Sequence, residues 1–124
     1  MPRRGATRIA ALETLCARAK GAALPLSPRL SRPYGPLRIA KPRGRPYVYS
    51  NFVSTLDGVV SLNVAGHASG GDISGFAAQD RMVMGLLRAV ADAIVIGSGT
   101  LDADRHHVWT PEAIFPPLAS DFRR

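Results

Sequence analysis

The chain has 124 residues, 46% of them apolar, which suits one small globular domain and excludes a disordered or fibrous chain. It has no run of roughly 18 uncharged apolar residues, which excludes a membrane-spanning helix. Cys16 is the only cysteine, so an internal disulfide and a cysteine-based zinc site are also excluded. The net charge of +7 is uneven: residues 1–46 carry 11 Lys and Arg against one acid, whereas residues 47–124 carry five Arg against eight acids. We therefore divide the chain into a basic arm, 1–46, and a domain, 47–124.

The basic arm is expected to contain a short helix followed by a connector. A basic last turn and a glycine stop at Lys20-Gly21 predict a helix over about 7–20. Such a helix is marginal alone in water, so it should dock on the domain or on a neighbouring chain. Six prolines within 24–46 exclude a long helix there and indicate a Pro-rich connector. The apolar side chains at helical spacing are Ile9, Leu12, Leu15, Cys16 and Ala19.

The charge of the arm leaves several interpretations open. An Arg-rich arm can bind nucleic acid or an anionic membrane surface, but Arg-rich usage also follows from genome composition alone. Residues 1–33 also resemble an organelle transit peptide, since they are rich in Arg and poor in acids. We favour a cytoplasmic arm, with no membrane attachment and no nucleic-acid partner.

The domain alternates between strand-like and helix-like patterns. Residues 47–55 are rich in β-branched and aromatic types and predict a buried strand, with a shorter strand at 59–62. Asp72 or Ser74 can cap a helix that ends near Val90. The apolar run 93–96 is typical of a buried parallel strand. Strand, helix and strand in this order predict an α/β fold, a mostly parallel sheet flanked by helices with a right-handed crossover.

Beyond Thr100 the sequence is polar and then broken by prolines, with room for one helical turn starting near 110–112. In open α/β sheets, ligands bind outside the carboxyl ends of the strands. Three polar segments are therefore candidates for binding: 54–58, the glycine-rich loop 66–75, and 97–104.

Two of these segments carry motifs. Ser54-Thr55-Leu56-Asp57-Gly58 is similar to the Ser-Leu-Asp-Gly signature that opens the reductase domain of riboflavin-biosynthesis deaminase/reductases. Residues 87–89 (Leu-Arg-Ala) and 91–100 (Ala-Asp-Ala-Ile-Val-Ile-Gly-Ser-Gly-Thr) resemble the next signature of that family, in the same order and spacing. The resemblance covers residues 48–109, half of the chain.

The resemblance implies the N-terminal half of a three-layer dihydrofolate-reductase-like domain. The implied activity is an oxidoreductase of riboflavin biosynthesis: hydride transfer from NADPH reduces a phosphorylated ribosylamino-pyrimidine to its ribitylamino form. The implied partners are the missing second half of the domain or another copy of the chain, in a homodimer. The family's second half supplies a glycine-rich segment for the cofactor phosphates and a late glutamate near the substrate, so this chain alone is expected to turn over poorly.

The resemblance also assigns residues by position. Arg88 matches a substrate-side arginine, and its planar fork suits a phosphate group. Asp57 is the catalytic candidate, because a protonated group near the imine nitrogen assists reduction. The cofactor-side positions are Ser54, Ser74, Gly97, Gly99, Thr100 and Asp104.

Each assignment has a structural alternative. Asp57 also suits a turn, Arg88 also complements a helix dipole, and Thr100 can also cap a helical turn. His106 and His107 near Asp104 do not predict a metal site, because adjacent histidines point in different directions. The alternative function is a noncatalytic binding or assembly module, whose basic arm and open sheet edge recruit an acidic partner or nucleic acid.

Overall fold

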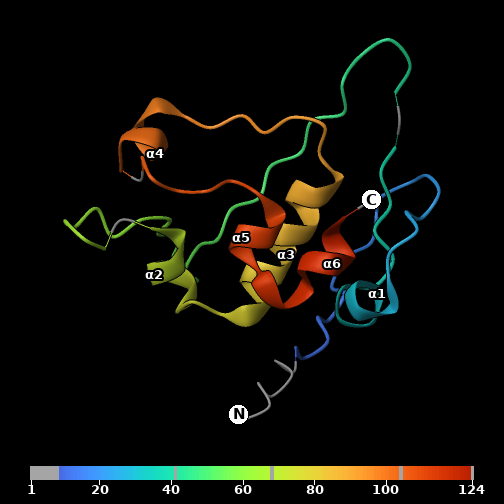
Figure 1. Cartoon of the computed structure of the whole chain (residues 1–124), viewed down its shortest axis with the longest axis horizontal. Helices are drawn as coiled ribbons and strands as arrows, with labels where there is room; N and C mark the ends of the chain where they lie inside the picture. The colour runs from blue at the N-terminus through green and yellow to red at the C-terminus, as the bar shows by residue number, and fades with distance from the viewer. Residues whose placement is uncertain (1–8, 41, 68, 104, 124) are drawn as a thin grey trace.

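The computed structural model describes residues 9–40, 42–67, 69–103 and 105–123. Its regular elements are all helical, and Figure 1 shows α1, α3, α5 and α6 gathered together while α2 and α4 lie apart from them on one side. The elements are α1 (Pro28–Tyr34), α2 (Gly70–Ser74), α3 (Ala78–Val90), α4 (Ser98–Ala103), α5 (Pro111–Ile114), the 3-10 turn η1 (Pro116–Leu118) and α6 (Ala119–Phe122).

The predicted α/β fold is wrong, because the described residues form no β-strand. Only two isolated antiparallel bridges occur there, Ala23 with Arg38 and Val64 with His67. The predicted mostly parallel sheet, its crossover and the dihydrofolate-reductase-like layers are therefore absent from the described chain.

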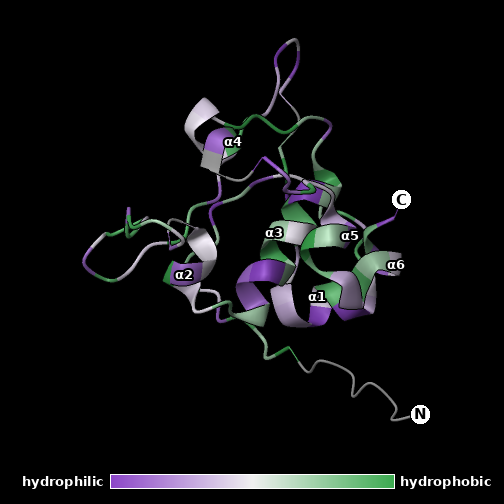
Figure 2. Ribbon diagram, turned by 60° about the vertical axis from the view of Figure 1, so that its left-hand side comes forward, coloured by the Kyte–Doolittle hydropathy of each residue, from purple (hydrophilic) through white to green (hydrophobic). Residues whose placement is uncertain are grey.

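The segments predicted as strands run extended and exposed instead. Phe52 is 81% exposed and Val95 is 95% exposed, and Figure 2 shows the hydrophobic colour along the trace between α3 and α4. A pair of strands is not stable without further strands or a covering helix. The helix that would cover such a sheet, α3, packs against α5 and α6 instead, which explains why the strand pattern finds no sheet.

The predicted helix over 7–20 is also wrong for the part described, 9–20, which is irregular and mostly exposed. One backbone hydrogen bond anchors it, from Leu12 N to Pro33 O at 2.8 Å. A helix of this length needs an apolar surface under its whole stripe. In the described stretch Ile9 packs against the core, whereas Leu15 is 88% exposed, so the stripe is not covered.

The helix predicted to end near Val90 is present, and its end is confirmed, but it begins in two pieces. Ser69 caps α2, and Asp72 completes the capping box. The chain then turns through left-handed backbone at Gly75 (φ 58°) and Phe76 (φ 55°) before α3 starts. A bulky residue such as Phe76 rarely adopts that conformation, so the backbone between α2 and α3 is strained at this turn.

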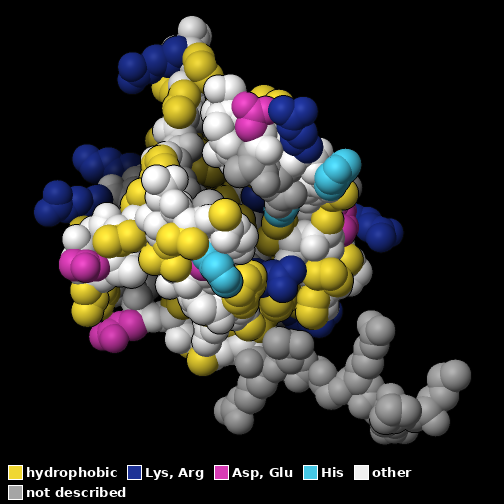
Figure 3. Space-filling view, turned by 90° about the vertical axis from the view of Figure 1, so that its left-hand side faces the viewer, with side chains coloured by type: hydrophobic (Ala, Val, Ile, Leu, Met, Phe, Trp, Pro, Cys, Tyr) yellow, Lys and Arg dark blue, Asp and Glu magenta, His cyan; other side chains and the backbone are white. Residues whose placement is uncertain are grey.

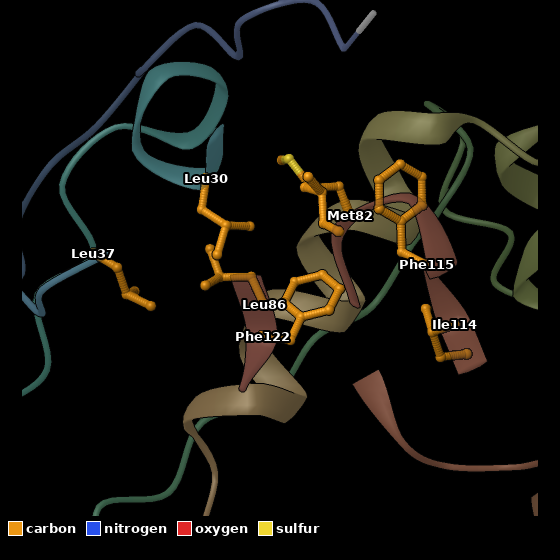
Figure 4. Packing of buried hydrophobic residues seen from close by; sticks show 8 residues of the cluster. Leu30, Leu37, Met82, Leu86, Ile114, Phe115 and Phe122 are labelled. Atoms are coloured by element: carbon orange, nitrogen blue, oxygen red, sulfur yellow. The ribbon is translucent and has the colours of Figure 1, made fainter. Parts of the chain in front are cut away.

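The hydrophobic core lies among α1, α3 and the C-terminal helices. Figure 4 shows Leu30, Leu86 and Phe122 pointing toward one another. Half of the buried hydrophobic residues come from the proline-broken tail, and Leu30 and Leu37 come from the segment predicted as a Pro-rich connector, which contains α1 and contributes to the core. The full set is Leu30, Leu37, Met82, Leu86, Ile114, Phe115, Leu118 and Phe122.

Polar contacts join the tail to α1. The Ser27 hydroxyl donates to Asp121 at 2.7 Å, and Arg29 donates to the same carboxylate at 2.8 Å.

Thr110 caps α5 and Pro111 occupies its first turn, as the sequence predicted. A bilayer-spanning helix is not found in the described ranges, where the longest helix, α3, has 13 residues.

Candidate functional site

Arg88 is the predicted site residue that lies against two aromatic side chains. It lies half-buried in the last turn of α3. Its guanidinium carbon lies 4.9 Å from the centroid of the Trp109 ring, and its Nη1 lies 3.4 Å from Nε2 of His107. The rings of His107 and Trp109 are 4.4 Å apart. We call Arg88, His107 and Trp109 the arginine cluster.

Arg88 gives the arginine cluster its positive charge. Burial lowers the pKa of Arg88 from its ordinary value, but a guanidinium keeps its charge in proteins. The ion pairs between described residues join Arg29 to Asp121, His67 to Asp72, and Arg105 to Asp102. Arg88 is in none of them. A half-buried arginine that stacks on an aromatic ring, with no described acid paired to it, is suited to bind an anion such as a phosphate.

Ser54 and Ser74 lie on neighbouring segments. A Cβ added to Gly70 would lie 3.2 Å from Cγ1 of Val53, so the chain before Ser54 runs against the start of α2. Ser54 itself is exposed. Ser74 ends α2, and its hydroxyl donates to the carbonyl of Gly71 at 3.3 Å. The structure therefore brings the first two predicted cofactor-side segments close together.

The third cofactor-side segment forms α4 and the residue before it. Leu101 N donates to Gly97 O at 3.1 Å, and Gly97, Gly99 and Thr100 are exposed. A Cβ added to Gly97 or Gly99 would meet nothing within 4 Å. No described neighbour is close enough to either position to exclude a larger residue there. Asp104, the remaining cofactor-side candidate, lies outside the described residues.

Asp57 sits in a tight turn. The Thr55 hydroxyl donates to the Asp57 carboxylate, and Gly58 N donates to Thr55 O at 3.0 Å. Gly58 has a φ of 90°, which favours glycine. Asp57 remains exposed, so its carboxylate supports the turn and also faces solvent.

One polar constellation near α2 was not singled out from the sequence. Asp72 accepts hydrogen bonds from the Ser69 hydroxyl at 2.6 Å and the Ser69 amide at 3.1 Å, and its other oxygen lies 3.0 Å from Nδ1 of His67. The hydrogen bonds from Ser69, and then the one from His67, lower the pKa of Asp72. The serine contacts the carboxylate rather than the imidazole, so this is a helix cap and not a nucleophile with its base.

Figure 3 shows the face that carries α2 and α4, where hydrophobic side chains are exposed among isolated histidines and charged groups. Within the described ranges, no group of three His, Cys, Asp or Glu side chains could hold a metal ion. Sequence reasoning did not identify His107 and Trp109 as partners of Arg88. Their spacing could have indicated that they act together, because residues two apart lie on one face of an extended segment.

Comparisons with known protein families, with curated proteins and with solved structures found no match to this chain. The resemblance carried by the motifs at 54–58 and 87–100 therefore remains a hypothesis.

Proposed function

We propose that the chain provides binding elements of an NADPH-dependent reductase that acts on a phosphorylated ribosylamino-pyrimidine. The observation that carries the proposal is the arginine cluster, in which a half-buried guanidinium faces no carboxylate among the described residues. The order of the motifs at 54–58 and 87–100 supports the same function. The proposal depends on α3 and on loops, and it requires no sheet.

On the substrate side, Arg88 would hold the phosphate. Its fork offers several N–H donors, and only one of its nitrogens lies near His107. His107 lies beside the guanidinium, with its Nε2 3.4 Å from Nη1 of Arg88, so it helps to orient the fork. The Trp109 ring supports the guanidinium from one side and limits its rotation.

On the cofactor side, the exposed loops have open space and hydroxyl groups that suit a nucleotide. The open space around Gly97 and Gly99 allows a ligand to approach the backbone closely. Ser54 and Thr100 offer exposed hydroxyls. NADPH supplies the hydride when it is bound, so the chain's residues need only bind and orient the reactants. Asp57 is exposed, and we assign it the place beside the imine nitrogen, which takes up a proton as hydride adds to the imine carbon.

The reductase proposal includes a polypeptide partner, either the second half of the domain or another copy of this chain in a homodimer. The support is exposed apolar surface, including Phe52, Val60 and Val95.

The substrate side can be tested directly, because Trp109 is the only tryptophan. We expect ribose 5-phosphate to change its fluorescence, and Arg88→Lys to weaken that binding at least about tenfold through loss of the planar fork. Arg105→Lys is the matched control, since Arg105 is an exposed arginine paired with Asp102. Unchanged binding by Arg88→Lys would contradict the assignment.

The cofactor side needs a separate measurement. NADPH should raise the melting temperature of the chain in a concentration-dependent way, because a ligand that binds only the folded state stabilises it. Nicotinamide mononucleotide alone should have a smaller effect. An NADPH effect that is absent both for this chain and for a mixture with a candidate partner would sink the reductase proposal.

A further inference from the structure

All three tyrosines of the chain line one groove. The groove has a volume of about 320 Å³ and lies between the segment after α1, the extended segment that begins at Tyr47, and the side of α3. Val83 and Leu87 are among its apolar lining residues. The volume is enough for a planar ring system with part of a sugar. We call this site the tyrosine groove.

The three tyrosines are held differently. The Tyr49 hydroxyl donates to the Leu87 carbonyl at 2.6 Å, which fixes its ring against α3. Tyr34 is half-buried, and burial raises the pKa of its hydroxyl, so it stays neutral. Tyr47 is 45% exposed, and its ring centroid lies 6.2 Å from that of Tyr49. Tyr47 is therefore supported on one side and has a face available for stacking.

One cation lines the groove and two more lie on the loop that leads into it. Arg38 is the lining residue, and it donates to the carbonyl of Gly21 at 2.8 Å. Arg43 and Arg45 are exposed on the loop 42–46, which projects away from the helices and leads directly into Tyr47 (Figure 1). The described residues that line the groove include no Asp or Glu.

We infer that the tyrosine groove, together with Arg38 in its lining and with Arg43 and Arg45 on the adjoining loop, binds single-stranded nucleic acid. Tyr47 stacks on a base, while Arg38, Arg43 and Arg45 neutralise successive phosphates. An aromatic platform between spaced cations is the arrangement that binds single strands without sequence preference. A free nucleotide would occupy the ring site and leave the loop arginines unused. The inference is independent of the proposed reductase function, because it uses none of the residues in the arginine cluster.

The test measures fluorescence anisotropy of a labelled 15-nucleotide oligothymidylate titrated with the full chain. We expect Tyr47→Leu to weaken binding about tenfold, since stacking is worth roughly 1–3 kcal/mol per base. Phe76→Leu is the matched control: Phe76 is an exposed aromatic outside the groove, and its loss should leave binding unchanged. Equal effects of the two variants would overturn the inference.

The charge component is tested by salt dependence. The double variant Arg43→Gln/Arg45→Gln should reduce the slope of log affinity against log salt by about 1.4, since each single-strand phosphate contact contributes roughly 0.7. Arg105→Gln, which changes an arginine on α4's side of the molecule, should leave the slope unchanged. These arginines are exposed, so the variants should remain folded, and circular dichroism checks this.

Two further results would overturn the inference. One is binding of duplex DNA as tightly as the single strand, because a duplex cannot offer an unstacked base. The other is full competition by uridine monophosphate at concentrations that saturate the groove, which would identify a mononucleotide site. Preference for the single strand together with weak competition by the mononucleotide supports the inference, and neither result bears on NADPH binding.

Discussion

Gly85 and Phe122 give the sharpest test of the helical core. Gly85 is buried in α3, and a Cβ added there would lie 2.6 Å from Cζ and 2.9 Å from Cε2 of the Phe122 ring. Phe122 is only 4% exposed, so its ring cannot move freely into solvent. Gly85→Ala therefore costs about 2 kcal/mol by overpacking and regains about 1 kcal/mol from helix propensity. We expect a net loss of about 1 kcal/mol.

A double-mutant cycle separates this packing from general effects of the substitution. Phe122→Leu alone should cost roughly 1 kcal/mol, because it removes part of a buried ring. In the double variant the methyl group added by Gly85→Ala occupies the vacated space, so the combined loss should be smaller than the sum by at least about 0.5–1 kcal/mol. Urea unfolding followed by circular dichroism measures all four free energies. Strict additivity, or a stabilising Gly85→Ala, would refute the packing described for α3 and α6.

Three further predictions concern local contacts. Gly99→Ala should raise the melting temperature, because its Cβ meets nothing within 4 Å and alanine favours helix; if it binds NADPH as tightly as the unaltered chain, the glycine is not needed for close approach. Asp121→Asn should cost about 1–2 kcal/mol in urea unfolding, because the carboxylate charge that strengthens the hydrogen bonds from Ser27 and Arg29 is lost; an unchanged midpoint would contradict the link between α1 and α6. Hydrogen bonds from Ser69 hold the folded-state pKa of Asp72 below its ordinary value of 3.8, so its contribution is present above 3.8 and lost as pH falls through the lowered pKa. Asp72→Asn should flatten the acid side of the stability profile, and an unchanged profile would contradict this.

Features that depend on local rules could be predicted from the sequence. The end of α3 at Val90 follows from its apolar periodicity, and the start of α5 follows from Thr110 before Pro111. The tight turn at Asp57 and Gly58 follows from the preference of these residue types for turns. Each feature is determined by residues within a few positions of one another.

The strands could not be predicted reliably, because a strand is completed by partners that the local pattern does not specify. Residues 47–55 and 93–96 have the composition of buried strands, but a sheet also needs neighbouring strands and a covering helix. The apolar face of α3 packs on the tail helices instead. The pattern predicted buried segments, whereas the structure leaves Phe52 and Val95 exposed.

The tail was underestimated because its prolines were interpreted as breaks. Ile114, Leu118 and Phe122 recur at intervals of four, the spacing of one helical face. Proline is tolerated in the first turn of a helix, and Pro116 starts η1 in this way. The arginine cluster was missed for a different reason: His107 lies 19 residues from Arg88, a separation at which sequence spacing carries no information on contact.

The extended apolar segments lead to a last prediction, on association. Phe52 and Val95 are 81% and 95% exposed, so replacing either with lysine removes almost no folded-state packing. Exposed apolar patches of this kind favour protein contacts, and we expect the unaltered chain to associate with increasing concentration in sedimentation velocity. Phe52→Lys and Val95→Lys should shift it toward monomer while leaving the urea midpoint of the dilute protein nearly unchanged. A chain that stays monomeric at all concentrations, or variants that lose stability without changing association, would show that these segments are covered by the chain's own fold and that no second copy covers them.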